Sequence, residues 1–131
     1  MEENKTLDNT RFSLLKRAKS FTHAGRGIFI FIKTTHNAWL HLLIFAAAIV
    51  LGIYFKITHI EWILLVLTGG FVLSAEAFNT AIEIDINLTS PEYHPFARDT
   101  KDVAAGAVLI SAIIAGIVGI LIFGKYFIEL F

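Results

Sequence analysis

Three long apolar runs constrain the fold of this chain more than any other feature of its sequence. The first extends from Ala38 to Phe55, the second starts at Trp62, and the third extends from Val103 to Phe123. Each run approaches the roughly 20 residues that an α-helix needs to cross the hydrocarbon core of a bilayer. Amphipathic aromatic rings favour the membrane interface, and four of them fall near the ends of these runs: Trp39, Tyr54, Trp62 and Tyr126.

A water-soluble bundle of buried helices is the alternative explanation for so many apolar residues. Hydrophobic residues make up 56% of the 131 residues, above the roughly 45–50% that is usual in soluble domains. A chain this short cannot build a core large enough to bury them, and no polar outer face remains for water. We therefore predict an all-α integral membrane protein, a single domain over residues 1–131, with transmembrane helices over 38–57, 61–86 and 102–126.

The segment before the first run has a helical pattern of its own. Its apolar side chains recur at helical spacing, and its basic side chains project from the opposite side. This pattern predicts an amphipathic helix over residues 11–34 that lies on the inner leaflet of the membrane. Anchoring to anionic lipid is one role for such a helix, and a contribution to a functional site is compatible with it. The apolar stripe consists of Leu14, Leu15, Ala18, Phe21, Gly25, Ile28, Phe29 and Ile32.

The basic residues predict the orientation of the spans. Of the eleven Lys and Arg residues, seven precede the first run, and Arg98 and Lys101 lie between the second and the third. The other two, Lys56 and Lys125, lie on the opposite side. Because cytoplasmic loops carry an excess of Lys and Arg, the N-terminus and the second loop are expected in the cytoplasm.

Four polar residues lie inside or at the end of the second apolar run: Glu76, Asn79, Thr80 and Glu83. A carboxylate there is costly unless it is paired, hydrated or bound to a metal. With about 100° of rotation per residue, Glu83 lies about 20° from Glu76 around the helix axis and Asn79 about 60° from it. The three therefore share one face, which must meet another helix or a water-filled cleft. Polar residues can also join transmembrane helices, but two carboxylates that flank an Asn fit a functional site better.

The loop that follows the second run holds most of the remaining cytoplasmic polar side chains. Two prolines interrupt helix within it, with Glu92, Tyr93 and His94 between them, and Lys101–Asp102 opens the third run. A Lys beside paired carboxylates suits phosphate chemistry, because the carboxylates can hold Mg²⁺ and the Lys offsets the charge of the transferring group. Taken alone, Lys101–Asp102 is also explained as an interfacial anchor and helix cap.

Several other functions are not supported by the sequence. It contains no Walker-type phosphate loop, no protein-kinase signature and no identifiable Ser/His/Asp set. The absence of Cys excludes a disulfide framework and thiolate chemistry, and a formal net charge of zero offers no basic field for a nucleic acid. His36, His41 and His59 lack metal-ligand spacing and are predicted to lie at the membrane interface.

Three stretches together resemble the prokaryotic diacylglycerol kinase family, which includes undecaprenol kinases. Glu76-Ala-Phe-Asn-Thr-Ala-Ile-Glu83 is followed by Glu92-Tyr-His94 and then by Lys101-Asp-Val-Ala-Ala-Gly-Ala-Val-Leu109. The likeness covers most of the chain from Arg11 onward. It implies a homotrimer in the bacterial inner membrane that transfers the γ-phosphoryl group of ATP, with Mg²⁺, to a lipid alcohol. Diacylglycerol and undecaprenol are both candidate acceptors, and both belong to lipid metabolism.

The resemblance also implies roles for individual residues. Glu76 matches the carboxylate that takes the proton of the lipid hydroxyl, and Asn79 matches a polar residue required beside it. Glu83 matches a carboxylate that binds the metal of Mg·ATP. Contacts with the nucleotide are implied for Lys16, His23, Glu83, Glu92, Tyr93, His94, Lys101 and Asp102.

Some positions depart from the family pattern. Thr35 stands where the family normally carries a second metal-binding Glu, and a hydroxyl is a weaker Mg²⁺ ligand than a carboxylate. Asn87 stands where many members have Asp, so the negative charge near the nucleotide is lower again, and Asp85 or Asp102 could compensate in part. His23 falls where the family often has an aromatic residue, and Arg17 could serve in place of Lys16.

Two further classes of function remain open on the sequence. The Thr35 substitution motivates a catalytically impaired relative that acts as a lipid- or nucleotide-binding membrane protein. Intramembrane acids also mark ion paths, which motivates a small transporter or channel component. Against a channel, the acids cluster toward the cytoplasmic end of the second run, and no ionisable residue continues the path through that span.

Overall fold

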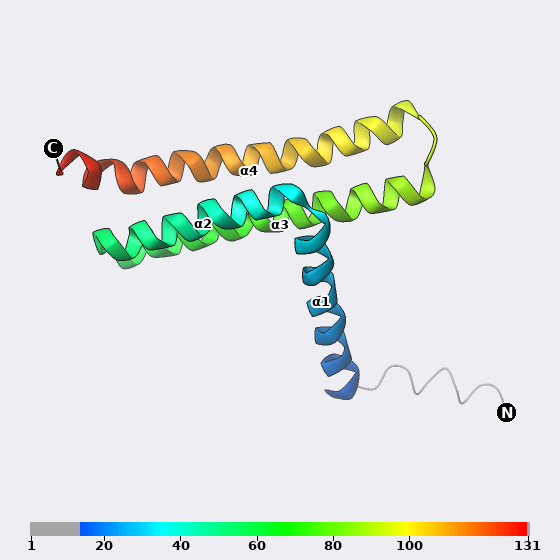
Figure 1. Ribbon diagram of the computed structural model, residues 1–131, viewed down its shortest axis with the longest axis horizontal. Helices are drawn as coiled ribbons and strands as arrows, with labels where there is room; N and C mark the ends of the chain where they lie inside the picture. Colours follow the sequence, from blue (N-terminus) through cyan, green and yellow to red (C-terminus); the bar gives the residue numbers. More distant parts are fainter. Residues whose placement is uncertain (1–13, 131) are drawn as a thin grey trace. The chain divides into compact units, whose positions relative to one another are not determined.

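The computed structural model describes residues 14–130, and this part of the chain is built from α-helices (Figure 1). The described helices are α1 (Leu14–Thr34), α2 (His36–Phe55), α3 (His59–Thr89) and α4 (Pro95–Ile128). By length and composition, α2, α3 and α4 are each able to cross a membrane. The prediction of an all-α protein with three transmembrane helices after an N-terminal helix is therefore confirmed.

The chain divides into two compact units, one up to Ile30 and one from Phe31 onward, and each is described by itself. In the first unit, α1 is helical from its first described residue, and the predicted helix start at residue 11 lies outside the described residues. Apolar side chains of its stripe are exposed, with exposed fractions of 80% for Phe21 and 64% for Phe29. An apolar stripe on a helix that also carries basic side chains is typical of a helix at a membrane surface.

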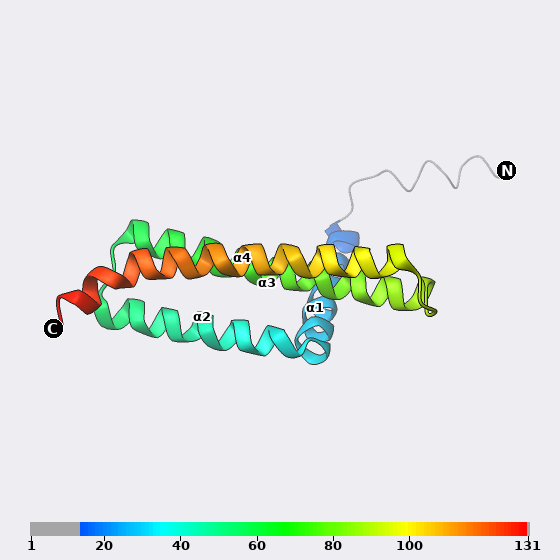
Figure 2. The same cartoon turned by 90° about the horizontal axis from the view of Figure 1, so that it is seen from above.

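In the second unit, α2, α3 and α4 run alongside one another (Figure 1; Figure 2). The middle of the three in sequence, α3, contacts both neighbours, and its contact with α4 is the more extensive. Gly69 allows α2 to approach α3 closely, because a Cβ atom at this position would collide with the ring of Phe45. Small residues serve this purpose widely in membrane helix packing.

Local sequence fixes the turn between α2 and α3. Lys56 adopts a left-handed backbone conformation (φ 52°) and ends α2 directly after Phe55. The next helix starts with a capping box, in which the Thr58 hydroxyl accepts from the Glu61 N–H and the Glu61 carboxylate accepts from the Thr58 N–H. These reciprocal bonds satisfy backbone donors that a helix start would otherwise leave unpaired.

The first turn of α4 begins at Pro95, earlier than the start at position 102 that hydropathy predicts. Proline suits the first helical position, because its missing N–H would have no intrahelical partner there. The ring Nδ1 of His94 accepts a hydrogen bond of 3.3 Å from the N–H of Phe96. This cap and the proline extend α4 through polar residues that precede its apolar run.

A polar cluster ties the start of α3 to the end of α4. The Nζ atom of Lys125 lies 2.6 Å from the Glu61 carboxylate, and the Tyr126 hydroxyl donates to the same carboxylate at 2.9 Å. Charge-assisted bonds of this kind are stronger than neutral ones. A small apolar core contacts this end of the bundle and consists of Ile57, Leu65, Ile122 and Phe123.

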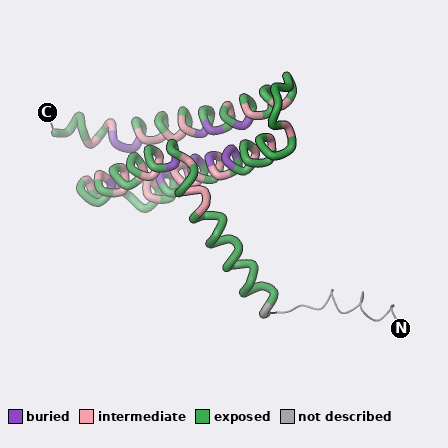
Figure 3. Tube along the Cα trace, turned by 45° about the vertical axis from the view of Figure 1, so that its right-hand side comes forward, coloured by how far each residue is buried: buried purple, intermediate pink, exposed green. Residues whose placement is uncertain are grey.

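Buried residues are few, and most of the surface of the helices is exposed (Figure 3). Large apolar side chains such as Leu43, Phe71 and Ile120 have exposed fractions above one half. So large an apolar surface fits surroundings of lipid or of other membrane helices. The buried polar side chains among the described residues are those of Glu76, Asn79, Thr80 and Ser111.

Candidate active site

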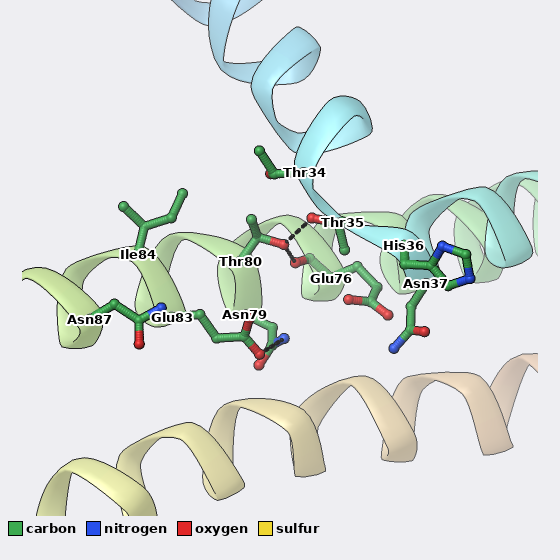
Figure 4. A pocket seen from close by; sticks show the side chains of 10 residues that line it. All are labelled: Thr34, Thr35, His36, Asn37, Glu76, Asn79, Thr80, Glu83, Ile84 and Asn87. Atoms are coloured by element: carbon green, nitrogen blue, oxygen red, sulfur yellow. Dashed lines mark hydrogen bonds between the residues drawn. The ribbon is translucent and has the colours of Figure 1, made fainter. Parts of the chain in front are cut away.

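A polar pocket lies beside α3 where the start of α2 passes it (Figure 4). Its volume is about 320 Å³. It brings together four of the predicted site residues, Thr35, Glu76, Asn79 and Glu83. The complete lining consists of Thr34, Thr35, His36, Asn37, Glu76, Asn79, Thr80, Glu83, Ile84 and Asn87.

Glu76 is the most deeply buried ionisable residue of this pocket, with 2% of its surface exposed. Its Oε1 atom lies 3.2 Å from Nε2 of His41, which projects from α2. The two atoms lie within the distance of an ion pair or a hydrogen bond, and Nε2 is the atom of the pair that is able to donate. Burying a carboxylate is costly without such a partner, and the contact with α2 therefore stabilises Glu76 in its place.

Asn79 and Glu83 are linked along one face of α3. The amide Nδ2 of Asn79 donates to Oε1 of Glu83 at 3.1 Å. The other amide atom, Oδ1, is buried and has no hydrogen-bond partner among the described residues. Buried acceptors are normally paired, so this oxygen is available to a ligand, a water molecule or a cation. Both carboxyl groups and the Asn79 amide project from the same side of α3 (Figure 4).

Thr35 lines the pocket, and its hydroxyl forms a hydrogen bond with another side chain. It is 2.6 Å from the hydroxyl of Thr80, which also donates to the backbone carbonyl of Glu76 at 2.9 Å. Since a hydroxyl has a single proton, Thr35 must be the donor in the first of these bonds. The two bonds connect the junction of α1 and α2 to the turn of α3 that carries Glu76.

Lys101 reaches the edge of the pocket through Asn87. Its Nζ atom donates to Oδ1 of Asn87 at 2.6 Å, and Asn87 itself lines the pocket. Asp102 has a different partner, because its carboxylate lies 3.9 Å from Nε of Arg98. Of the predicted Lys101–Asp102 pair, only the lysine therefore approaches the pocket.

Three other predicted nucleotide-binding residues of the second unit, Glu92, Tyr93 and His94, do not line the pocket. Glu92 and Tyr93 are exposed in the loop between α3 and α4, and His94 caps α4. Lys16 and His23 are exposed on α1 in the N-terminal unit. Their contribution to a nucleotide site stays a prediction.

The oxygen donors of the pocket fit a Mg²⁺ ion that arrives with a nucleotide. Among residues 14–130, no three acidic, His or Cys side chains converge to hold a metal by themselves. In kinase sites, however, Mg²⁺ is held by one or two carboxylates together with substrate phosphates and water. The Glu83 carboxylate and the unpaired Oδ1 of Asn79 suit this arrangement, whereas the hydrogen-bonded Thr35 hydroxyl is a poor ligand.

His41 lies closer to the pocket than the sequence indicates, and its depth in the membrane stays a prediction. Only 19% of its side chain is exposed, and it contacts Glu76. It also lines an apolar cavity of about 490 Å³ among α2, α3 and α4. The signal in the sequence was an ionisable residue within an apolar run, since such residues usually face the interior of a helix bundle.

The sequence is similar to a known protein family and to several kinases over most of its length. The sequence profile of the family described as prokaryotic diacylglycerol kinase matches residues 22–123. The chain is 42% identical to an undecaprenol kinase of Bacillus subtilis over 105 residues, which cover 80% of this chain and 85% of that protein. It is 38% identical to a diacylglycerol kinase of Synechocystis over 101 residues, covering 76% and 58%. A diacylglycerol kinase of Helicobacter pylori is 29% identical over 127 residues, covering 92% and 96%.

Proposed function

Since this chain belongs to the prokaryotic diacylglycerol kinase family, we propose that it uses ATP to phosphorylate a membrane lipid alcohol at the cytoplasmic face. The observation that carries this proposal is the polar pocket on α3, in which two carboxylates and an amide converge on a helix able to cross a membrane. The names of the relatives point to undecaprenol and diacylglycerol as the two candidate acceptors.

In the proposed reaction Glu76 is the general base. Its carboxylate takes the proton of the lipid hydroxyl, and the hydroxyl oxygen forms a bond to the γ-phosphorus of ATP. The bond from that phosphorus to the bridging oxygen breaks, and its electron pair leaves with ADP. Glu76 then passes its proton to water. The burial of this carboxylate at the edge of a polar pocket supports the assignment.

The nucleotide is proposed to bind on the side of Glu83. Glu83 and Asn79 would hold the Mg²⁺ of Mg·ATP, and the metal would offset the charge of the phosphates. Lys101, which approaches through Asn87, would offset the charge that develops on the transferring group. The nucleotide site would be completed by Lys16, His23, Glu92, Tyr93, His94 and Asp102.

The reaction is proposed to take place in a homotrimer in the bacterial inner membrane. Nine of the eleven basic residues lie on the side of the N-terminus and the α3–α4 loop, which supports a cytoplasmic location for both. The pocket lies toward this same end of α3. The extensive exposed apolar surface of α2, α3 and α4 supports contacts with lipid and with neighbouring copies.

The decisive experiment is a phosphotransfer assay in detergent micelles with Mg·ATP and either diacylglycerol or undecaprenol. We expect one phospholipid product formed per ADP released, and no product when Mg²⁺ is removed with EDTA. Comparing kcat/KM for the two lipids would identify the preferred acceptor. Folded protein that phosphorylates neither lipid in the presence of Mg²⁺ would contradict the proposal.

A catalytically impaired relative is the second candidate function, because Thr35 replaces a carboxylate at the pocket. Thr35→Glu is expected to lower the Mg²⁺ concentration for half-maximal activity by about tenfold, which corresponds to about 1.4 kcal/mol. A carboxylate in surroundings of low dielectric can supply an attraction of this size. A Mg²⁺ titration of both forms measures the effect.

Thr89→Glu is the matched control, because it adds the same charge at the exposed end of α3, outside the pocket. It should leave the Mg²⁺ dependence unchanged. If the original protein and Thr35→Glu are equally inactive although both are folded, a binding function without catalysis becomes the better explanation.

A further inference from the structure

We propose that His41 is a positioning residue for Glu76, which holds one carboxylate oxygen so that the other faces the lipid hydroxyl. The inference rests on the proposed function and assigns a role in that site to a residue on a different helix. Three observations support it: the contact itself, the location of the pair, and the lack of another partner.

The contact joins two separate helices at hydrogen-bonding distance. Nε2 of His41 on α2 lies 3.2 Å from Oε1 of Glu76 on α3. The two side chains are largely shielded, with exposed fractions of 19% and 2%. A polar contact of this length is electrostatically stronger in such surroundings than in water. It therefore restricts rotation of the carboxyl group more than a surface contact would.

The pair lies where a polar space and an apolar space meet. Glu76 lines the polar pocket together with Asn79 and Glu83. His41 lines the apolar cavity among α2, α3 and α4, and it is the one ionisable side chain among the described residues around that cavity. A lipid hydroxyl has to come from apolar surroundings and meet the phosphate in polar ones, so a base at this boundary is suitably placed.

In the described part of the chain, no second basic side chain contacts the Glu76 carboxylate, and His41 is the only one within 4 Å of it. The other ionisable residues that line the polar pocket are His36 on α2 and Glu83 on α3, and both are exposed. Glu83 instead accepts from Asn79. Removing His41 would leave the buried carboxylate without a hydrogen bond from a charged or polar side chain, and free to turn away from the acceptor.

The test compares the original protein with three His41 variants and one control variant in the micellar kinase assay. His41→Leu, which removes the donor, is expected to lower kcat for the lipid roughly 10- to 30-fold, within the range found when groups that orient a reactive ligand are removed. KM for Mg·ATP should stay within about twofold, because Glu83 and Asn79 are unchanged. A loss of kcat at constant KM separates positioning from nucleotide binding.

Rescue by a conservative variant gives the second measurement. His41→Gln places an amide donor near the position of Nε2 and should recover kcat to within about threefold of the original protein. His41→Asn carries the same amide one methylene shorter and cannot reach Glu76 in the same way, so it should remain impaired. These two variants differ little in polarity, so comparing them tests whether His41 positions Glu76 even if His41→Leu fails to fold.

His59→Leu is the matched control, because His59 is exposed at the start of α3, away from the pocket. It should keep the original kcat. Thermal unfolding in detergent and ATP binding establish that each variant is folded. Equal kcat for folded His41→Gln and His41→Asn, or an original kcat in folded His41→Leu, would overturn the positioning role alone. Absence of lipid phosphorylation by the original protein would instead overturn the proposed function, and the inference with it.

Discussion

Glu76→Gln is expected to lower kcat for lipid phosphorylation by about 10³-fold, within the range attributed to general base catalysis. The amide is nearly the same size as the carboxylate, and its oxygen can still lie against Nε2 of His41 as a hydrogen-bond acceptor. It cannot, however, take a proton from the lipid hydroxyl. The fold and the affinity for Mg·ATP should therefore change little while the chemical step is lost.

Steady-state kinetics with saturating lipid, together with ATP binding measured separately, tests this expectation. Glu129→Gln is the matched control, because it makes the same chemical change at an exposed residue that follows the end of α4, and it should retain full activity. A folded Glu76→Gln protein with kcat within tenfold of the original would exclude Glu76 as the base.

Glu83→Gln is expected to lower kcat/KM for Mg·ATP by about 10²-fold or more, the size found when one electrostatic stabiliser is removed from an active site. The side-chain oxygen can still accept from Nδ2 of Asn79, so the local geometry on α3 is retained. What is lost is the negative charge that attracts the metal. The Mg²⁺ requirement should rise in parallel, whereas KM for the lipid should not change.

A titration of Mg²⁺ at fixed ATP, followed by one of lipid at fixed Mg·ATP, separates these effects. The Glu129→Gln control applies here as well, because it removes one negative charge without touching the pocket. If Glu83→Gln raised KM for the lipid and left the Mg²⁺ dependence as it was, Glu83 would belong to the acceptor side of the site instead.

The spans and one face of the site could be predicted from the sequence because both depend only on residues that are near one another in the chain. A run of about 20 apolar residues is long enough to span a bilayer as a helix, and this can be recognised without knowing how the rest of the chain folds. The regular turn of an α-helix likewise places Glu76, Asn79 and Glu83 on one side before any tertiary contact is known. In the structure all three line the same pocket.

The partners of these residues could not be predicted, because they depend on how separate helices are aligned. His41 meets Glu76 only because α2 lies against α3 at a particular offset. The bond from Lys101 to Asn87 similarly depends on the loop that reverses the chain between α3 and α4. Neither pairing follows from spacing along a single helix.

Long apolar runs were enough to predict membrane-spanning helices, and residue spacing was enough to predict that one of them carries a polar face. The family resemblance also follows from the sequence, since motif order is a property of the chain. Only the packing of the helices shows which residues from outside α3 contact that face: His41 contacts Glu76, and Thr35 contacts Thr80. The physical reason is that apolar periodicity is local, whereas hydrogen bonds between helices require atoms within about 3 Å and hence a specific register of the packed helices.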